Sequence, residues 1–324
     1  MLDLLAHAKW FVEDPGGRPD WAFLSDPVSL SLIGAALALA LAWRAVARRL
    51  PTPELGALSF LGRVAPWVPR LLGVHLGVSL LSLAVTNAYL APNLSLDPVP
   101  AGWAIAFAEA LVGVWLIAGV ALRPAALAVA ALGPLGMVLA GPVAVLEAAD
   151  LLGIALFLAL LPPGAHRYGA RPVTAGQIRV PLLALRLCVG GALIVVALTE
   201  KLLNPELTAA FLEDYPALDV FALLGLDLDA AAYIRFTAAV EILFGLLIIS
   251  GAAPQAAVIL AGIPFNATLF FLDRGELIGH LPIYGAMLAL LVYGSSRTLA
   301  PAVPWLPLSG PPVRRARTRT PTTT

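Results

Sequence analysis

The chain has 324 residues, of which 60% are hydrophobic and 12% are charged, and its formal net charge is zero. Its mean hydropathy is +0.90. A soluble fold cannot bury this much apolar surface, so the composition excludes a soluble protein and predicts a polytopic membrane protein. The one cysteine, Cys188, excludes an intramolecular disulfide, a CxxC redox pair and a cysteine zinc site.

Residues 1–26 carry apolar and aromatic side chains beside charged ones. This mixture predicts a short amphipathic helix along the outer face of the membrane. The segment lacks the basic start and the small-residue cleavage site of a signal peptide. Its stretch HAKWFVEDP, residues 7–15, matches no motif that assigns it a role.

Nine apolar stretches follow, and each approaches the roughly 20 residues that a helix needs to cross a bilayer. The fifth is short and has to begin near Glu147. Gly133–Pro134 and the pair Gly262/Pro264 lie inside two of the stretches and predict kinks there. The stretches are residues 27–43, 68–91, 103–121, 124–143, 148–162, 181–200, 233–251, 254–272 and 278–294.

Arginines gather in alternate loops between these stretches and in the C-terminal tail, which together hold 15 of the 20 Lys and Arg residues. Of the 20 acidic residues, only Glu54 falls on the side of the membrane that holds these arginine-rich loops. The positive-inside rule therefore predicts that the N-terminus lies outside and the C-terminus in the cytoplasm. The Arg-rich, Lys-poor composition is typical of a bacterium, which makes the inner membrane the expected location.

The chain contains an internal repeat, because residues 66–165 resemble residues 179–296. Both copies start on the same side of the membrane, which is typical of parallel repeats. The matched positions are Thr86–Pro92 with Thr199–Pro205, Glu109 with Glu241, Gly119 with Gly251, and Glu147 with Glu276. The predicted fold is all-α: an interfacial segment (1–26), a first transmembrane helix and loop (27–65), two tandem four-helix units (66–165 and 179–296) and a basic, disordered cytoplasmic tail (297–324).

The second copy contains RLCVGGALIVVALTEKLLNP, AVEILFGLLIISG and ELIGHLP, and on these motifs it resembles the DoxX-like family of integral membrane proteins. The first copy matches less well, since TNAYLAP stands in place of TEKLLNP. The resemblance implies four-helix membrane bundles. Some members are small subunits of thiosulfate:quinone oxidoreductases, so it also implies quinone as the candidate cofactor and a membrane or periplasmic redox partner.

Most remaining polar side chains lie in outer loops or at the outer ends of predicted spans. An ionisable group inside a membrane costs roughly 2.5–3.5 kcal/mol on insertion scales and usually faces the interior of a bundle. Their shared depth therefore predicts a polar pocket that opens to the outer face. The candidates are Glu109, Glu147, Asp150, Glu200, Lys201, Arg235, Glu241, Asn266, Asp273, Glu276 and His280.

Glu109 and Glu241 lie within otherwise apolar stretches. They are either proton-carrying carboxylates or hydrogen-bonding groups that hold each unit together, and Glu109 lies near the headgroups if its span begins later. Glu200 and Lys201 point about 100° apart in a helix, so we expect each to pair elsewhere, with Arg235 or Glu241. This set forms either a site for an anionic or quinone oxygen or an ion-pair network.

Glu276 and His280 are four residues apart and share a face if that segment is helical. With Asp273 they form either a proton relay or the cap of the last span. Two or three ligands from one short loop are too few to predict a metal site, whose candidate ligands would be Glu276, His280 and His7.

The acidic loop 204–232 is expected to cover the pocket as a lid or to serve as a docking surface. Three functions stay open. The first is a membrane subunit or partner of a redox system that binds a quinone or small ligand near the outer face. The others are a proton-coupled small-molecule transporter and an assembly scaffold without catalysis. No stretch resembles a nucleic-acid-binding surface.

Overall fold

The computed structural model describes residues 8–13, 16, 18–162, 164, 173–223, 225–226, 228–272 and 274–307. These residues are almost entirely helical, with one short antiparallel pair of strands, β1 (Ala88–Tyr89) and β2 (Ala91–Ser95). The longer helices are α2 (Pro27–Ala47), α3 (Val68–Val85), α4 (Gly102–Ala118), α5 (Leu122–Glu147), α6 (Ala149–Leu160), α7 (Ala175–Val196), α8 (Pro205–Asp214), α10 (Ala230–Ser250), α11 (Pro254–Thr268) and α12 (Arg274–Ser295). The shorter elements are η1 (Ala8–Trp10), α1 (Trp21–Ser25), η2 (Gly56–Trp67), the π-helix η3 (Ala197–Leu202), η4 (Pro216–Leu218), α9 (Val220–Leu223) and η5 (Ala300–Ala302).

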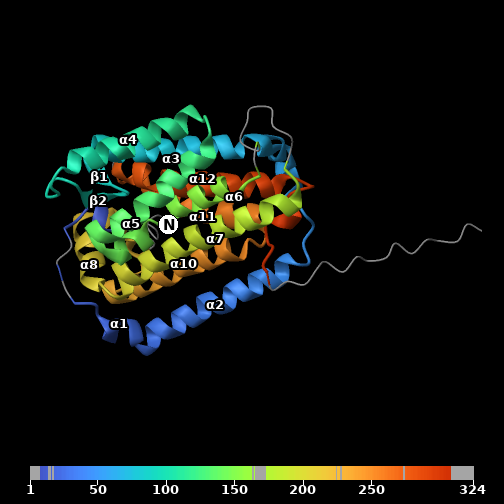
Figure 1. Cartoon of the computed structure of the whole chain (residues 1–324). Helices are drawn as coiled ribbons and strands as arrows, with labels where there is room; N and C mark the ends of the chain where they lie inside the picture. Colours follow the sequence, from blue (N-terminus) through green and yellow to red (C-terminus); the bar gives the residue numbers. More distant parts are fainter. Residues whose placement is uncertain are drawn as a thin grey trace, which may run out of the picture.

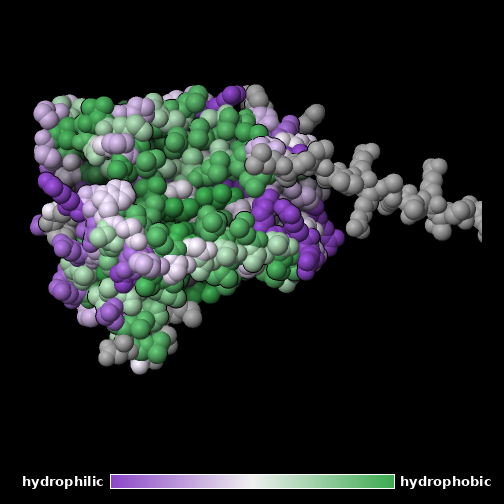
Figure 2. Space-filling view, turned by 90° about the horizontal axis from the view of Figure 1, so that it is seen from below, coloured by the Kyte–Doolittle hydropathy of each residue, from purple (hydrophilic) through white to green (hydrophobic). Residues whose placement is uncertain are grey.

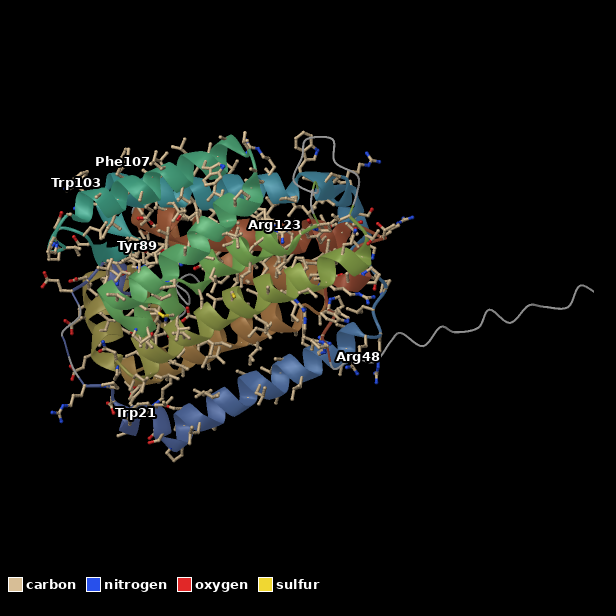
Figure 3. The ribbon with its side chains drawn as sticks, in the orientation of Figure 1. Trp21, Arg48, Tyr89, Trp103, Phe107 and Arg123 are labelled. Carbon is tan, nitrogen blue, oxygen red and sulfur yellow. The ribbon has the colours of Figure 1, made fainter. Side chains whose placement is uncertain are left out.

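The long helices run side by side, and their ends gather at two opposite ends of the bundle (Figure 1). We call the end that holds β1, β2 and α8 the hairpin end. The opposite end holds η2, and we call it the arginine end, since the C-terminal end of α2 with Arg48 lies there (Figure 3).

The surface between these two ends is apolar. Figure 2 shows a broad hydrophobic band flanked by hydrophilic residues. Leu41, Phe107 and Val138 are 62%, 60% and 82% exposed, respectively, which suits contact with lipid rather than water. Within the described residues, six helices are long and apolar enough to cross a membrane, so the chain fits a multi-pass membrane protein. They are Pro27–Ala47, Gly56–Val85, Leu122–Glu147, Ala175–Leu202, Ala230–Ser250 and Gly275–Ser295.

All nine predicted stretches contain a helix, but three of these helices are short. α4, α6 and α11 have 17, 12 and 15 residues. At 1.5 Å per residue they measure roughly 26, 18 and 22 Å, less than the roughly 30 Å of a hydrocarbon core. The short α6 begins after a break at Ala148, where ψ is 20°, so Glu147 ends α5 instead of beginning the next helix.

The main break inside a helix lies at Gly141, where φ is 87° and ψ is 166°, and not at the predicted Gly133–Pro134. Gly141 precedes Pro142, and a residue before proline is pushed out of the α conformation. Only glycine adopts this positive φ without strain. Pro134 lies inside α5 without a comparable break.

The described part of residues 1–26 does not form the amphipathic helix that the sequence predicts. It contains only the three-residue η1 and the five-residue α1. Ala8 is 3% exposed and packs with Leu207 and Phe211 of α8, so η1 lies inside the hairpin end of the bundle. We call residues 8–13 the strap.

Two pairs of glycines bring helices into close contact. A Cβ at Gly77 of α3 would collide with the Gly113 carbonyl of α4, and a Cβ at Gly190 of α7 would collide with the Gly245 carbonyl of α10. Small residues at such crossings let helix backbones approach within van der Waals distance. In addition, α12 packs on α3, just as α6 packs on α7.

The last helix, α12, occupies the middle of the bundle, where it contacts α3, α6, α7 and α11. Where α12 comes closest to α3, Gly285 leaves room for the side chain of His75. Glu276 and His280, in the first two turns of α12, are therefore enclosed by protein and are both 0% exposed.

Candidate functional site

The most buried polar pair of the hairpin end lies on α12. His280 Nδ1 is 3.1 Å from Glu276 Oε1, as expected for residues four apart on one helix face. The same carboxylate oxygen accepts a hydrogen bond of 2.5 Å from Thr268 Oγ1 at the end of α11. The expected shared face is therefore present. Thr268 fixes the carboxylate, which lies beside the imidazole ring of His280.

Aromatic rings enclose this pair. The ring of Phe265 meets His280 edge-on at a centroid distance of 5.0 Å, and the ring of Trp10 lies 4.9 Å from it. Trp10 comes from the strap and lies directly against Gly279, where a Cβ would collide with its six-membered ring. The strap therefore places an aromatic side chain over the Glu276–His280 pair.

A second contact holds the strap in place. Lys9 Nζ lies 2.6 Å from Glu147 Oε1 at the end of α5, and both side chains are largely buried. The same oxygen accepts a 2.5 Å hydrogen bond from Thr199 Oγ1 of η3. Glu147 therefore joins the strap to α5 and η3.

A small pocket of about 20 Å³ lies beside these groups: Trp10, Glu147 and Gly279 line it, whereas Glu276 and His280 do not. The strap, β2, the α5–α6 junction, α7 and α12 all contribute to its wall. Its polar lining comes mainly from Asn93, Glu147 and Asp150, and α12 contributes Gly279 and Ile283. Trp10 also lines the pocket, so the strap forms part of its wall.

The π-helix η3 carries a third buried pair. Lys201 Nζ lies 2.8 Å from Glu241 Oε2 of α10, with the side chains 5% and 0% exposed. Glu241 is thus one of the two partners that the sequence analysis offers for Glu200 and Lys201. The extra residue in each π turn changes the direction in which side chains leave the helix. Thr199 contacts Glu147, whereas Lys201 contacts Glu241 on another helix.

Glu109, which the predicted repeat matches with Glu241, has a different partner. Its Oε1 accepts a hydrogen bond of 3.2 Å from the backbone N–H of Leu90. Leu90 has a positive φ of 59°, and this turn presents its N–H to α4. Glu109 is 0% exposed, and its Oε2 has no hydrogen-bond partner in the described part of the chain. Tyr89 lies beside this turn (Figure 3), and its hydroxyl donates to the Leu132 carbonyl of α5.

The other predicted pocket residues lie in different places. Glu200 is buried, and its carbonyl accepts from Thr208 of α8. Arg235 lies over the ring of Phe23 and near Asp26, at the start of α2. Asn266 is exposed and donates back to the Gly262 carbonyl of its own helix, away from the buried groups.

Asp273 and His7 lie outside the described residues. Within those residues, no group of three His, Cys, Asp or Glu side chains is arranged to hold a metal ion.

The sequence analysis missed Lys9, Trp10, Thr199 and Thr268 as parts of this site. One signal was available: the chain has only two lysines, Lys9 and Lys201. Both pair with a glutamate at the hairpin end. Lysine used this sparingly, next to a tryptophan in an apolar chain, indicates a specific ion pair rather than a solvated surface.

Fold and site together define a helical membrane protein with a buried polar cluster at one end. Comparisons with family models, with curated proteins and with solved structures gave no match. The resemblance to DoxX-like proteins therefore stays a prediction, and the function has to be argued from the geometry of the hairpin end.

Proposed function

We propose that this protein binds a quinone or a similar small ligand in the pocket of the hairpin end and acts as a membrane subunit or partner of a redox system. The observation that supports it most is the Glu276–His280 pair beneath Trp10. A buried carboxylate–imidazole pair is costly inside a membrane and usually serves a functional site. The redox assignment rests on the DoxX-like resemblance.

The side chains around the Glu276–His280 pair are of the types that suit a quinone head group. Trp10 and Phe265 provide flat apolar walls, and His280 can donate or accept a hydrogen bond. When bound, a quinone supplies two-electron, two-proton chemistry, with the electrons exchanged with a partner redox protein. Histidine is the side chain best suited to exchange protons near neutral pH, and Glu276 would hold its ring in place.

In this proposal, the strap controls the entry of the ligand to His280. Trp10 fills the space against Gly279, so a ligand ring reaches His280 only when the strap moves. The Lys9–Glu147 ion pair and the packing of Ala8 on α8 hold the strap closed. These few contacts in a short segment make local opening less costly than any movement of the long helices.

The proposal includes the architecture and orientation predicted from the sequence: two tandem four-helix units after one N-terminal helix, with the hairpin end outside a bacterial inner membrane. The matched glycine contacts Gly77–Gly113 and Gly190–Gly245 support the repeat. The arginines in the loops of the opposite end support the orientation.

The test is mass spectrometry of small molecules that co-purify with the protein from gently solubilised membranes. We expect about one equivalent of quinone in the wild type and an at least ten-fold loss in Glu276→Gln. Glu213→Gln is the matched control, because Glu213 is an exposed carboxylate on α8. Bulk lipid alone in all three preparations would contradict the proposal.

A proton-coupled transporter is the second candidate, and one observation favours it. Glu109 is buried with one carboxylate oxygen free of hydrogen bonds in the described part of the chain, as a proton-carrying group requires. Substrate uptake driven by a proton gradient and lost in Glu109→Gln would support transport over the redox assignment.

A further inference from the structure

A second cavity lies at the arginine end, at the opposite end of α2 from Trp21 (Figure 3). Its volume is about 380 Å³. It is an open cavity lined by the end of α2, the segment 48–54, Arg179 of α7, the turn between α10 and α11, and the segment 300–305. It shares no residue with the pocket of the hairpin end.

The charge that lines this cavity is mainly positive. Arg44, Arg48 and Arg179 line it, against one carboxylate, Glu54. Glu54 is already occupied, since its Oε1 accepts from the backbone N–H groups of Gln255 and Ala256 at the start of α11. The carboxylate therefore stabilises a helix N-terminus and neutralises the arginines only in part.

A fourth arginine stands behind the cavity wall. Arg186 of α7 is 0% exposed, and its Nη2 donates at 2.6 Å to the carbonyl of Trp305, which lines the cavity. Its Nη1 has no hydrogen-bond partner in the described part of the chain. Arg44 likewise donates to carbonyls, those of Ser250 and Pro304.

Neutral carbonyls accept these hydrogen bonds but bring no countercharge. A buried cation without an opposite charge is costly, and an anion bound in the cavity would offset that cost. Arginine is the residue best matched to phosphate, because its planar guanidinium donates two parallel hydrogen bonds to phosphate oxygens.

Apart from Thr52, the rest of the lining consists of apolar residues, which include Leu50, Pro51, Ala252, Pro254 and Pro301. Trp43 Nε1 donates at 2.8 Å to the carbonyl of Ala252 in the same wall. Tryptophan is enriched where the membrane meets water, which is consistent with a cavity at the depth of lipid headgroups.

We infer that the cavity formed by Arg44, Arg48 and Arg179 binds a phosphate-bearing anion. This site is independent of the proposed redox function. The phosphate belongs either to an anionic phospholipid or to a soluble ion, and both sources offer the same oxygens to the arginines. The apolar half of the cavity accommodates the glycerol and the first methylenes of a lipid.

The experiment is native mass spectrometry of delipidated protein in detergent, titrated with short-chain phosphatidylglycerol and, separately, with inorganic phosphate. We expect saturable binding of one equivalent of at least one of these anions. Arg48→Gln and Arg179→Gln should each weaken it about ten-fold or more. Arg179→Lys should retain more of the affinity than Arg179→Gln, since it keeps the charge.

Arg123→Gln is the matched control, because Arg123 is exposed at the start of α5 and does not line the cavity. We expect its affinity to stay within about two-fold of the wild type. Displacement of phosphatidylglycerol by inorganic phosphate assigns the site to a soluble anion, and its failure to displace the lipid assigns the site to a headgroup. Absence of a saturable equivalent, or an equal loss in Arg123→Gln and Arg179→Gln at unchanged melting temperature, overturns the inference.

Discussion

Lys201 Nζ lies 2.8 Å from Glu241 Oε2, and the two side chains are 5% and 0% exposed. In the repeat predicted from the sequence, Ala88 matches Lys201 and Glu109 matches Glu241, and Glu109 accepts a backbone N–H from Leu90 instead. Of these two buried glutamates, Glu241 therefore pairs with a cation, whereas Glu109 receives one hydrogen bond from the backbone of a turn.

Removal of one partner of the Lys201–Glu241 pair should cost more than removal of both. Lys201→Ala leaves the Glu241 carboxylate buried without its cation, and we expect the free energy of unfolding to fall by about 3–5 kcal/mol. Lys201→Ala/Glu241→Ala removes the stranded charge and should be more stable than the single variant. Reversible unfolding in mixed detergent, followed by circular dichroism, measures both. Equal stability of the two variants would argue against a buried ion pair.

Two adjacent glycines of α7 should respond in opposite ways to alanine. A Cβ at Gly190 collides with the Gly245 carbonyl, whereas a Cβ at Gly191 meets no atom within 4 Å. We expect Gly190→Ala to destabilise the protein by about 1–3 kcal/mol, as overpacking does. Gly191→Ala should be neutral or slightly stabilising, because alanine favours the helix. Thermal melting in detergent separates them, and similar melting temperatures would refute the close α7–α10 contact.

The strap should loosen when Gly279 gains a side chain. A Cβ there collides with the ring of Trp10, so Gly279→Ala should raise amide hydrogen exchange in residues 8–13 by about ten-fold or more. In Gly279→Ala/Trp10→Ala the collision is gone, and residues 274–284 should exchange as in the wild type. Gly262→Ala is the control, since its Cβ meets only ordinary contacts. Unchanged exchange of the strap in Gly279→Ala would contradict the packing described.

The proposed orientation predicts which end of the bundle meets the outside of the cell. In a Cys188→Ser background, we expect Asp97→Cys at the hairpin end to react with a membrane-impermeant maleimide in intact cells. Thr298→Cys at the arginine end should react only after the cells are opened. Both positions are exposed, so access to the reagent decides the result. The reverse pattern would show that the N-terminus lies inside.

The helical stretches could be predicted because bilayer thickness imposes a length and a composition on each span. Local breaks depend on finer geometry. At Gly141–Pro142 the glycine takes a positive φ, while Pro134 stays within the helix, and the sequence offers a Gly–Pro pair at both places. The shared face of Glu276 and His280 followed from their spacing, since α12 begins at Arg274 despite Gly275 and Gly279.

The strap could not be predicted from its own sequence. Its position depends on contacts across the whole chain, such as Lys9 with Glu147, which lie 138 residues apart. A segment with alternating apolar and charged residues satisfies the pattern of an interfacial helix equally well. The packing of Trp10 against Gly279 decides between a strap and an interfacial helix. No local sequence pattern encodes this packing.

The central claim is that the pocket of the hairpin end, with the strap in its wall, is a ligand site, and photo-crosslinking with a light-activated quinone analogue tests it most directly. Protein in nanodiscs is irradiated, and the labelled peptides are identified by mass spectrometry. The account predicts label in residues 8–13 or 274–284, lost when excess unlabelled quinone is present and reduced in Glu276→Gln. Label confined to the lipid-facing groove between α2, α10 and α11, and not displaced by unlabelled quinone, would contradict it.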